Sequence, residues 1–93
     1  MNILVIGGTG LFGRKTVLHL LRDKEISLVV AMDVNPPKDW AMKEIESYKD
    51  RFRFVRGDVA QLEDIMNAIK THSIDRIVNW AFLLPGEVLQ NNP

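Results

Sequence analysis

The sequence predicts an α/β fold in which a parallel sheet is flanked by helices. Short apolar runs alternate with longer segments of helical periodicity, in the order β-α-β-α-β-α-β. The predicted strands are apolar almost throughout, which indicates burial on both faces, as in parallel sheets. Strands separated by helices of about 10–15 residues are typical of right-handed βαβ units.

The first half of the chain contains two predicted strands and one predicted helix. Residues 2–6 form a short apolar run that ends in two glycines. Residues 11–23 follow the spacing of one helix face. That face consists of Gly13, Val17, Leu20 and Leu21. Residues 27–33 form a second apolar run that ends in Asp33, and the turn Asn35-Pro36-Pro37 follows it.

The second half repeats this alternation. A helix is expected over residues 41–48, and a strand over 52–55 that stops at Gly57-Asp58. A further strand is expected over residues 75–80. Between these strands lies the clearest helical period, with acidic residues in its first turn, where the helix dipole favours them. Its apolar face consists of Leu62, Ile65, Met66 and Ile69.

Composition narrows the class of protein. Ninety-three residues suffice for one small domain, and 46% of them are hydrophobic. Twelve basic and twelve acidic residues give zero net charge, which argues against a general binder of nucleic acids or anionic membranes. The absence of cysteine excludes disulfides, zinc-thiolate sites and thiol nucleophiles. No apolar run has the length of a membrane helix, and a cytoplasmic location is expected.

A glycine-rich loop directly follows the first strand. Within Gly7-Gly8-Thr9-Gly10-Leu11-Phe12-Gly13, Gly7 allows a sharp turn and Gly10 a close approach of backbone to a pyrophosphate. Gly13 allows the helix to pack tightly on the sheet. The N–H groups at the helix start would then face the phosphates. This strand–loop–helix context predicts dinucleotide binding. The alternative is a turn that uses glycine for packing only; a P-loop is excluded because no Gly-Lys-Ser/Thr follows.

Asp33 ends the second strand about 20 residues after Gly13. A carboxylate at this place accepts hydrogen bonds from the adenosine ribose hydroxyls and repels a 2′-phosphate, which predicts NAD rather than NADP. The alternative is an aspartate that only begins the following turn. Arg14 and Lys15 could serve a phosphate, so they leave the preference for NAD partly open.

These motifs resemble the extended short-chain dehydrogenases/reductases, the NAD-dependent epimerase/dehydratase family. The loop from Gly7 to Gly13, Asp33, Gly57-Asp58-Val59 and Ala81 match its motifs in order, over essentially all 93 residues. The resemblance implies a Rossmann-type sheet of strand order 3-2-1-4, and it places Asp58 and Val59 against the adenine. It implies the cofactor-binding residues Gly7, Thr9, Gly10, Leu11, Phe12, Gly13, Asp33, Asp58, Val59 and Ala81.

Taken alone, the later motifs have simpler interpretations. Gly57-Asp58 would be a turn that ends a strand, and the apolar run from Trp80 to Leu84 would be core. Three residues around Ala81 depart from the family pattern, namely Asn79, Trp80 and Phe82. The resemblance therefore implies a contact between the backbone of Ala81 and the nicotinamide-side ribose.

The resemblance further implies a catalytic tyrosine with a lysine four residues later. Phe52 stands four residues after Tyr48, the single tyrosine, so no catalytic residue is assigned. No metal site is expected, since His19 and His72 lack neighbouring ligands.

Residues 1–93 are therefore expected to be the N-terminal NAD(P)-binding portion of an oxidoreductase for a sugar nucleotide or related hydroxyl substrate. Its substrate domain and catalytic Tyr and Lys would lie beyond residue 93, after the Asn92-Pro93 ending. The alternative is a non-catalytic nucleotide-binding sensor or interaction module. The fourth strand would be an open edge with Trp80, Phe82, Leu83 and Leu84, which predicts a homodimer or other self-association.

Overall fold

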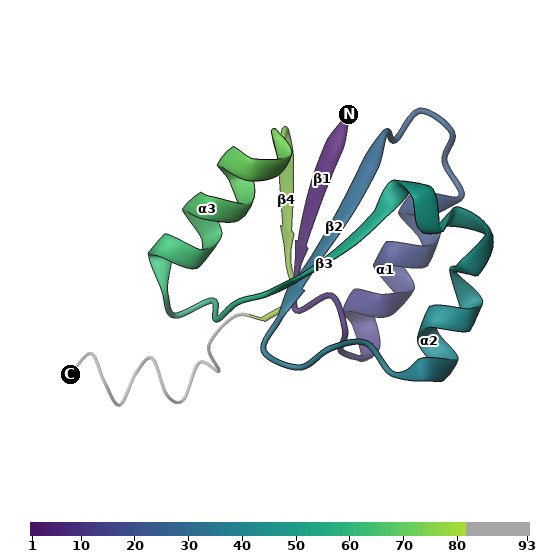
Figure 1. The fold of residues 1–93 in the computed structure, drawn as a ribbon, viewed down its shortest axis with the longest axis horizontal. Helices are drawn as coiled ribbons and strands as arrows, with labels where there is room; N and C mark the ends of the chain where they lie inside the picture. The colour runs from purple at the N-terminus through teal and green to yellow at the C-terminus, as the bar shows by residue number, and fades with distance from the viewer. Residues whose placement is uncertain (82–93) are drawn as a thin grey trace.

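The computed structural model describes residues 1–81, in which four strands alternate with helices (Figure 1). The elements are β1 (Asn2–Ile6), α1 (Leu11–Leu21), β2 (Leu28–Asp33), α2 (Asp39–Glu44), the 3-10 helix η1 (Glu46–Arg51), β3 (Phe52–Arg56), α3 (Leu62–His72) and β4 (Arg76–Asn79). Phe82, Leu83, Leu84 and Asn92-Pro93, which entered the expectations above, lie outside the described residues.

The four strands form one sheet in the order β3-β2-β1-β4. Every pairing is parallel, which confirms the predicted fold class and strand order. In the centre, Leu4 lies beside Val30 on β2 and beside Ile77 on β4. The carboxyl ends of all four strands therefore lie at the same edge of the sheet. Along this edge, the order in which the chain adds strands changes direction between β1 and β4. Ligands of open α/β sheets bind at such a switch point.

The core has two layers because both faces of the sheet are covered. Ile3 and Val5 point to the face that carries α1 and α2, whereas Leu4 and Ile6 point to the face that carries α3 (Figure 1). The same alternation along β2 places successive side chains in opposite layers. This two-sided burial explains why β1 and β2 are continuous apolar runs.

The helix predicted over residues 41–48 is interrupted. Helix α2 ends at Glu44, and η1 begins at Glu46. Between them Ile45 is buried with φ −105° and ψ 9°, outside the helical region. Tyr48 N donates to Ile45 O at 2.8 Å, and the three-residue repeat of η1 keeps Tyr48 on the side of Ile45. Tyr48 packs against the core on the α1 side.

The apolar face predicted for α3 is only partly buried. Ile65 and Ile69 pack against the sheet, but Leu62 is 67% and Met66 57% exposed. Ala68 is the buried residue of this helix. Its small side chain lets the helix backbone approach the sheet, so the contact line runs through Ala68 and leaves Leu62 and Met66 on the outer side. The expectation that all four apolar residues face the core is wrong for these two.

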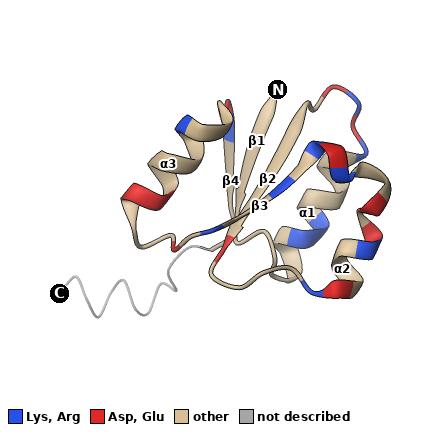
Figure 2. Cartoon of the chain, viewed as in Figure 1, with Lys and Arg blue, Asp and Glu red and all other residues tan. Residues whose placement is uncertain are grey.

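Charged residues of both signs lie on the helices and loops. Figure 2 shows basic and acidic positions interspersed along α2 and the segment after it, whereas β1 carries none. Among residues 1–81, no helix is long and apolar enough to cross a membrane. The same residues contain no group of three or more His, Cys, Asp or Glu side chains arranged to hold a metal ion.

Arg51 connects the end of η1 to the loop between α1 and β2. Its guanidinium donates to Ile26 O at 2.6 Å, to Asp23 O at 3.3 Å and to Leu21 O. Arg51→Met is expected to lower the free energy of unfolding by about 1.5 kcal/mol, because these charge-assisted hydrogen bonds are lost. Urea unfolding followed by circular dichroism measures this loss.

Arg53→Met is the matched control for that change. Arg53 is exposed, and within residues 1–81 its side chain donates only to the neighbouring carbonyls of Phe52 and Asp50. Its replacement is expected to change the unfolding free energy by less than about 0.5 kcal/mol. An equal loss in both variants would contradict the role given to Arg51.

Candidate cofactor-binding site

The loop after β1 turns sharply at Gly7, which has φ +75°. Gly7 N donates to Met32 O at 2.8 Å, and Gly7 O accepts from Gly10 N at 3.2 Å. A Cβ at Gly7 would lie 2.9 Å from Ala81 N. The left-handed backbone and this close neighbour both require glycine here. The turn predicted from the sequence is present.

Gly13 has the tightest surroundings of the described glycines. A Cβ there would lie 1.8 Å from Gly7 O and 2.7 Å from the Cα of Gly8. The sequence predicts close packing of α1 on the sheet at this residue. Gly13 instead contacts the backbone of Gly7 and Gly8, where the loop leaves β1. Gly13 therefore holds the start of α1 against the turn.

The start of α1 is open to an anion. Gly10 is exposed, and a Cβ there would meet only Gly7 O at 3.5 Å, an ordinary contact. Gly10 is also the N-cap of α1, and no side chain in the described part of the chain caps the helix. The first N–H groups of a helix have no acceptor within it, and the helix dipole favours negative charge there. Backbone without covering side chains is what close approach of a pyrophosphate requires.

Asp33 lies at the carboxyl end of β2, half-buried beside the glycine loop. Its Oδ2 accepts from Thr9 N at 3.2 Å, and its Oδ1 accepts from Val34 N at 2.8 Å. Thr9 Oγ1 donates in turn to Asn35 O at 3.2 Å. These bonds fix the carboxylate between the loop and the end of β2. Each of its oxygens keeps capacity for a further hydrogen bond, which a ribose diol can provide.

A depression of about 220 Å³ lies next to Asp33 at the same edge of the sheet. Its lining brings together residues from the ends of all four strands. Five of them were predicted from the sequence: Gly7, Asp33, Asp58, Val59 and Ala81. The remaining lining residues are Ile6, Met32, Val34 and Gly57. The lining is therefore mostly apolar and includes two aspartates, a combination that suits a flat base with polar edges.

Asp58 makes the predicted turn after β3 and also lines the depression. Its Oδ1 accepts from Ala60 N at 2.9 Å, which makes the turn after β3. Asp58 N donates to Asp64 Oδ2 at 3.0 Å, so the first turn of α3 holds the same segment. Asp58 is nevertheless exposed at the depression, where one carboxylate oxygen has no protein donor among residues 1–81.

Leu11 and Phe12 lie outside that depression. Their side chains are 57% and 62% exposed. The Phe12 ring packs against Trp80 with centroids 5.5 Å apart. Trp80 Nε1 donates to Thr16 Oγ1 at 2.8 Å. This residue, a departure from the family pattern, thus ties the end of β4 to α1.

Sequence reasoning missed Gly8. A Cβ there would lie 2.6 Å from the Cβ of Ala31 and 2.9 Å from Val5 O, so β2 excludes any larger residue. Its signal was the second glycine of the Gly7-Gly8 pair. Met32 was missed as well; it lies beneath Gly57, whose Cβ would meet its sulfur at 2.7 Å.

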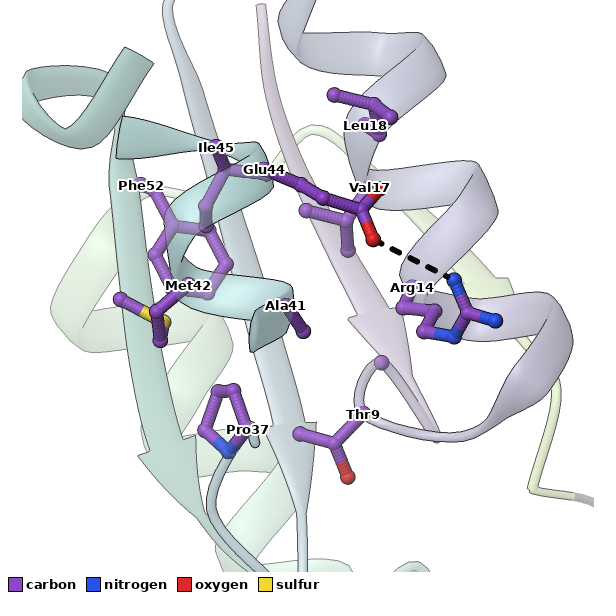
Figure 3. A pocket seen from close by; sticks show the side chains of 11 residues that line it. Thr9, Arg14, Val17, Leu18, Pro37, Ala41, Met42, Glu44, Ile45 and Phe52 are labelled. Atoms are coloured by element: carbon purple, nitrogen blue, oxygen red, sulfur yellow. Dashed lines mark ion pairs between the residues drawn. The ribbon is translucent and has the colours of Figure 1, made fainter. Parts of the chain in front are cut away.

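A separate small crevice of about 20 Å³ lies between α1 and α2 (Figure 3). Arg14 is held at this crevice by Glu44, with Nη1 3.8 Å from Oε1. The Arg14 guanidinium also lies 4.5 Å from the centroid of the Trp40 ring. Space for about one water molecule cannot hold a nucleotide. Arg14 is thus directed to α2, where Figure 3 shows its ion pair.

The model of the NAD dependent epimerase/dehydratase family matches residues 3–92. The chain belongs to this family. Dependence on NAD is a property of the family, and the identification confirms the resemblance drawn from the motifs.

Solved structures support the assignment of the fold. The dTDP-glucose 4,6-dehydratase of Bacillus anthracis, in complex with NAD, is 29% identical with a TM-score of 0.71 over 89% of this chain. A variant of the UDP-glucuronic acid 4-epimerase of Bacillus cereus, with NAD and a fluorinated UDP-sugar, is 26% identical with a TM-score of 0.60 over 86%. The UDP-Glc/GlcNAc 4-epimerase of Campylobacter jejuni, 22% identical with a TM-score of 0.70 over 97%, shows the same fold.

This epimerase/dehydratase-family chain is short beside those proteins. It spans 27%, 26% and 27% of the dehydratase, the UDP-glucuronic acid epimerase and the UDP-Glc/GlcNAc epimerase chains. The match therefore covers the strand ends and the loop described above, and the remaining parts of those proteins have no counterpart in the 93 residues.

Proposed function

We propose that residues 1–93 are the NAD-binding portion of an epimerase/dehydratase-type oxidoreductase that acts on a sugar nucleotide. The observation that carries this proposal is the convergence of the uncapped α1 start, the fixed carboxylate of Asp33 and the apolar depression at one edge of the sheet. Two of the similar solved structures, 29% and 26% identical to this chain, are NAD complexes of enzymes that act on sugar nucleotides. They support a sugar nucleotide as the substrate.

Different residues would contact different parts of the cofactor. The backbone of the glycine loop and of the first α1 turn would hold the pyrophosphate, Asp33 the adenosine ribose, and Asp58 with Val59 the adenine. The backbone of Ala81 would face the nicotinamide-side ribose. The complete proposed set is Gly7, Thr9, Gly10, Leu11, Phe12, Gly13, Asp33, Asp58, Val59 and Ala81.

Two features support NAD over NADP as the cofactor. Asp33 is fixed by two backbone N–H groups at the ribose position, where its charge opposes a 2′-phosphate. Arg14, the cation nearest in sequence to the loop, is paired with Glu44 and stacked on Trp40. It is therefore engaged away from the ribose position.

Bound NAD would supply hydride acceptance and return, while this portion of the chain binds and orients the cofactor. Tyr48 packs in the core on the α1 side, so we assign no proton-transfer role to it. We assign no residue of this chain as the catalytic tyrosine or lysine that the family resemblance implies.

Two further expectations remain predictions. Among residues 1–81, β4 pairs with β1 only, and Ile77 and Trp80 beside that edge are 46% and 42% exposed. This supports self-association through the edge as a homodimer. The cysteine-free composition supports a cytoplasmic location.

Isothermal titration calorimetry of the 93-residue chain with NAD tests the proposal. Micromolar to millimolar binding is expected, and Asp33→Asn should weaken it about tenfold to a hundredfold, because hydrogen bonds to a charged group are lost. Asp50→Asn, an exposed acid on η1, is the control and should leave NAD affinity unchanged. Equal NAD affinity of the wild type and Asp33→Asn would refute the ribose role.

A further inference from the structure

The indole of Trp80 joins the end of β4 to the first turns of α1. Trp80 follows β4 directly, and its Nε1 donates to Thr16 Oγ1 at 2.8 Å. Its ring also packs against Phe12, one turn before Thr16 on the same helix, with the two ring planes tilted by 30°. Within residues 1–81, the bond to Thr16 is the only hydrogen bond between residues 79–81 and α1.

The Thr16 hydroxyl uses both of its hydrogen-bonding functions in this contact. It donates to Phe12 O at 3.0 Å, one turn back along the helix, and it accepts from the Trp80 indole. A hydroxyl has one proton to donate and lone pairs to accept, whereas the indole N–H can only donate. A valine in place of Thr16 would therefore keep the shape of the side chain but could not receive the indole.

Ala81 follows Trp80 and lies against the turn of the glycine loop. A Cβ at Gly7 would lie 2.9 Å from Ala81 N and 3.0 Å from Ala81 Cβ. The pairing of β4 with β1 ends at Asn79, and Trp80 N donates to Ile6 O at 2.8 Å just beyond it. Ala81 N itself donates to the neighbouring Asn79 Oδ1 at 2.9 Å. The side chain that ties this segment to a helix is therefore the indole of Trp80.

We propose that Thr16 is a positioning residue for the nicotinamide side of the cofactor, acting through the Trp80 indole on the backbone of Ala81. This inference rests on the proposed function, which places the nicotinamide-side ribose at Ala81. The adenosine side depends on different contacts, the two backbone hydrogen bonds that fix the Asp33 carboxylate. Loss of the Thr16 bond should therefore weaken binding at one end of the cofactor only.

The simpler alternative is a threonine that only bonds to the carbonyl four residues back, as threonines within helices commonly do. In that case, removal of the hydroxyl would alter the stability of α1 but would leave the ratio of NAD affinity to ADP affinity unchanged. The indole favours the positioning role, because its N–H reaches the Thr16 hydroxyl from a residue 64 positions away.

Calorimetry of the 93-residue chain with NAD and with ADP tests the proposal. ADP has the adenosine and the pyrophosphate but neither the second ribose nor the nicotinamide. Thr16→Val is expected to weaken NAD binding about threefold to tenfold, the effect of one lost hydrogen bond, and to leave ADP affinity unchanged. Thr16→Ser keeps the hydroxyl and should bind NAD as the wild type does. Thr71→Val, the same change at an exposed threonine of α3, is the matched control and should alter neither affinity.

Trp80→Phe tests the other partner of the same bond. It removes the indole N–H and keeps an aromatic ring beside Phe12, so it should weaken NAD binding as much as Thr16→Val does. The double variant should bind NAD no more weakly than either single variant, because both changes remove one and the same hydrogen bond.

Three results would overturn the inference. They are an unchanged NAD affinity in Thr16→Val, an equal loss of NAD and ADP affinity in that variant, and additive losses in the double variant. Circular dichroism checks the fold of each variant, and Trp80→Phe alone carries the comparison of NAD with ADP if Thr16→Val does not fold. Failure of the wild type to bind NAD would overturn the proposed function itself.

Discussion

Replacement of Gly13 by alanine is expected to abolish NAD binding and to lower the free energy of unfolding by about 3 kcal/mol. The new methyl group would lie 1.8 Å from Gly7 O and 2.7 Å from Gly7 C. Both atoms belong to the backbone, so no side-chain rotation can relieve the overlap. The start of α1 must move away from the turn, and the loop that would hold the pyrophosphate opens.

Gly10→Ala is the matched control, because it adds the same methyl group three residues earlier. A Cβ at Gly10 meets only Gly7 O at 3.5 Å, so the unfolding free energy should fall by less than about 1 kcal/mol. NAD affinity should still fall, since the methyl group stands where the pyrophosphate approaches the backbone. Urea unfolding and calorimetry measure the two effects separately. Equal stability of Gly13→Ala and the wild type would contradict the packing described for the loop.

Leu4→Ala is expected to destabilise the chain by about 2–5 kcal/mol. Leu4 is fully buried in the centre of β1, in the core layer that α3 covers with Ala68. That layer rests on a single helix among residues 1–81, so the vacated space has few neighbours able to fill it. The loss of unfolding free energy should lie near the upper end of this range. Urea unfolding measures the loss.

Leu62→Ala provides the comparison at an exposed position of α3. The sequence places Leu62 on the apolar face of α3, but the structure leaves it 67% exposed. Its truncation should change the unfolding free energy by less than about 0.5 kcal/mol. A loss as large as that of Leu4→Ala would mean that α3 packs through the face predicted from its periodicity.

The parts of this protein that follow from local chemistry could be predicted from the sequence. A strand buried on both faces must be apolar throughout, so β1 and β2 could be recognised from their sequences. The turn at Gly7 needs a positive φ, and glycine after a strand reveals it. Asp33 could be placed beside the glycine loop because an acid at the end of the second strand lies next to the first loop in a parallel sheet.

Other features depend on which neighbours the fold supplies. The break at Ile45 follows from the need to bury that residue with Phe52, which periodicity along one segment does not reveal. The small Ala68, rather than the larger apolar residues, decides which side of α3 meets the sheet. Arg14 is drawn to Glu44 on α2, a partner 30 residues away.

By itself, the sequence determined the βα alternation, the parallel sheet, the glycine loop and the acid at the end of β2, because spacing and residue type decide each of them locally. Only the tertiary structure decided that Gly13 packs on the turn, that Trp80 bonds to Thr16, and that Arg56 stands over Val34 beside Asp33. The last two are hydrogen bonds between residues 64 and 22 positions apart in the chain, and only the pairing of the strands brings these residues within hydrogen-bonding distance.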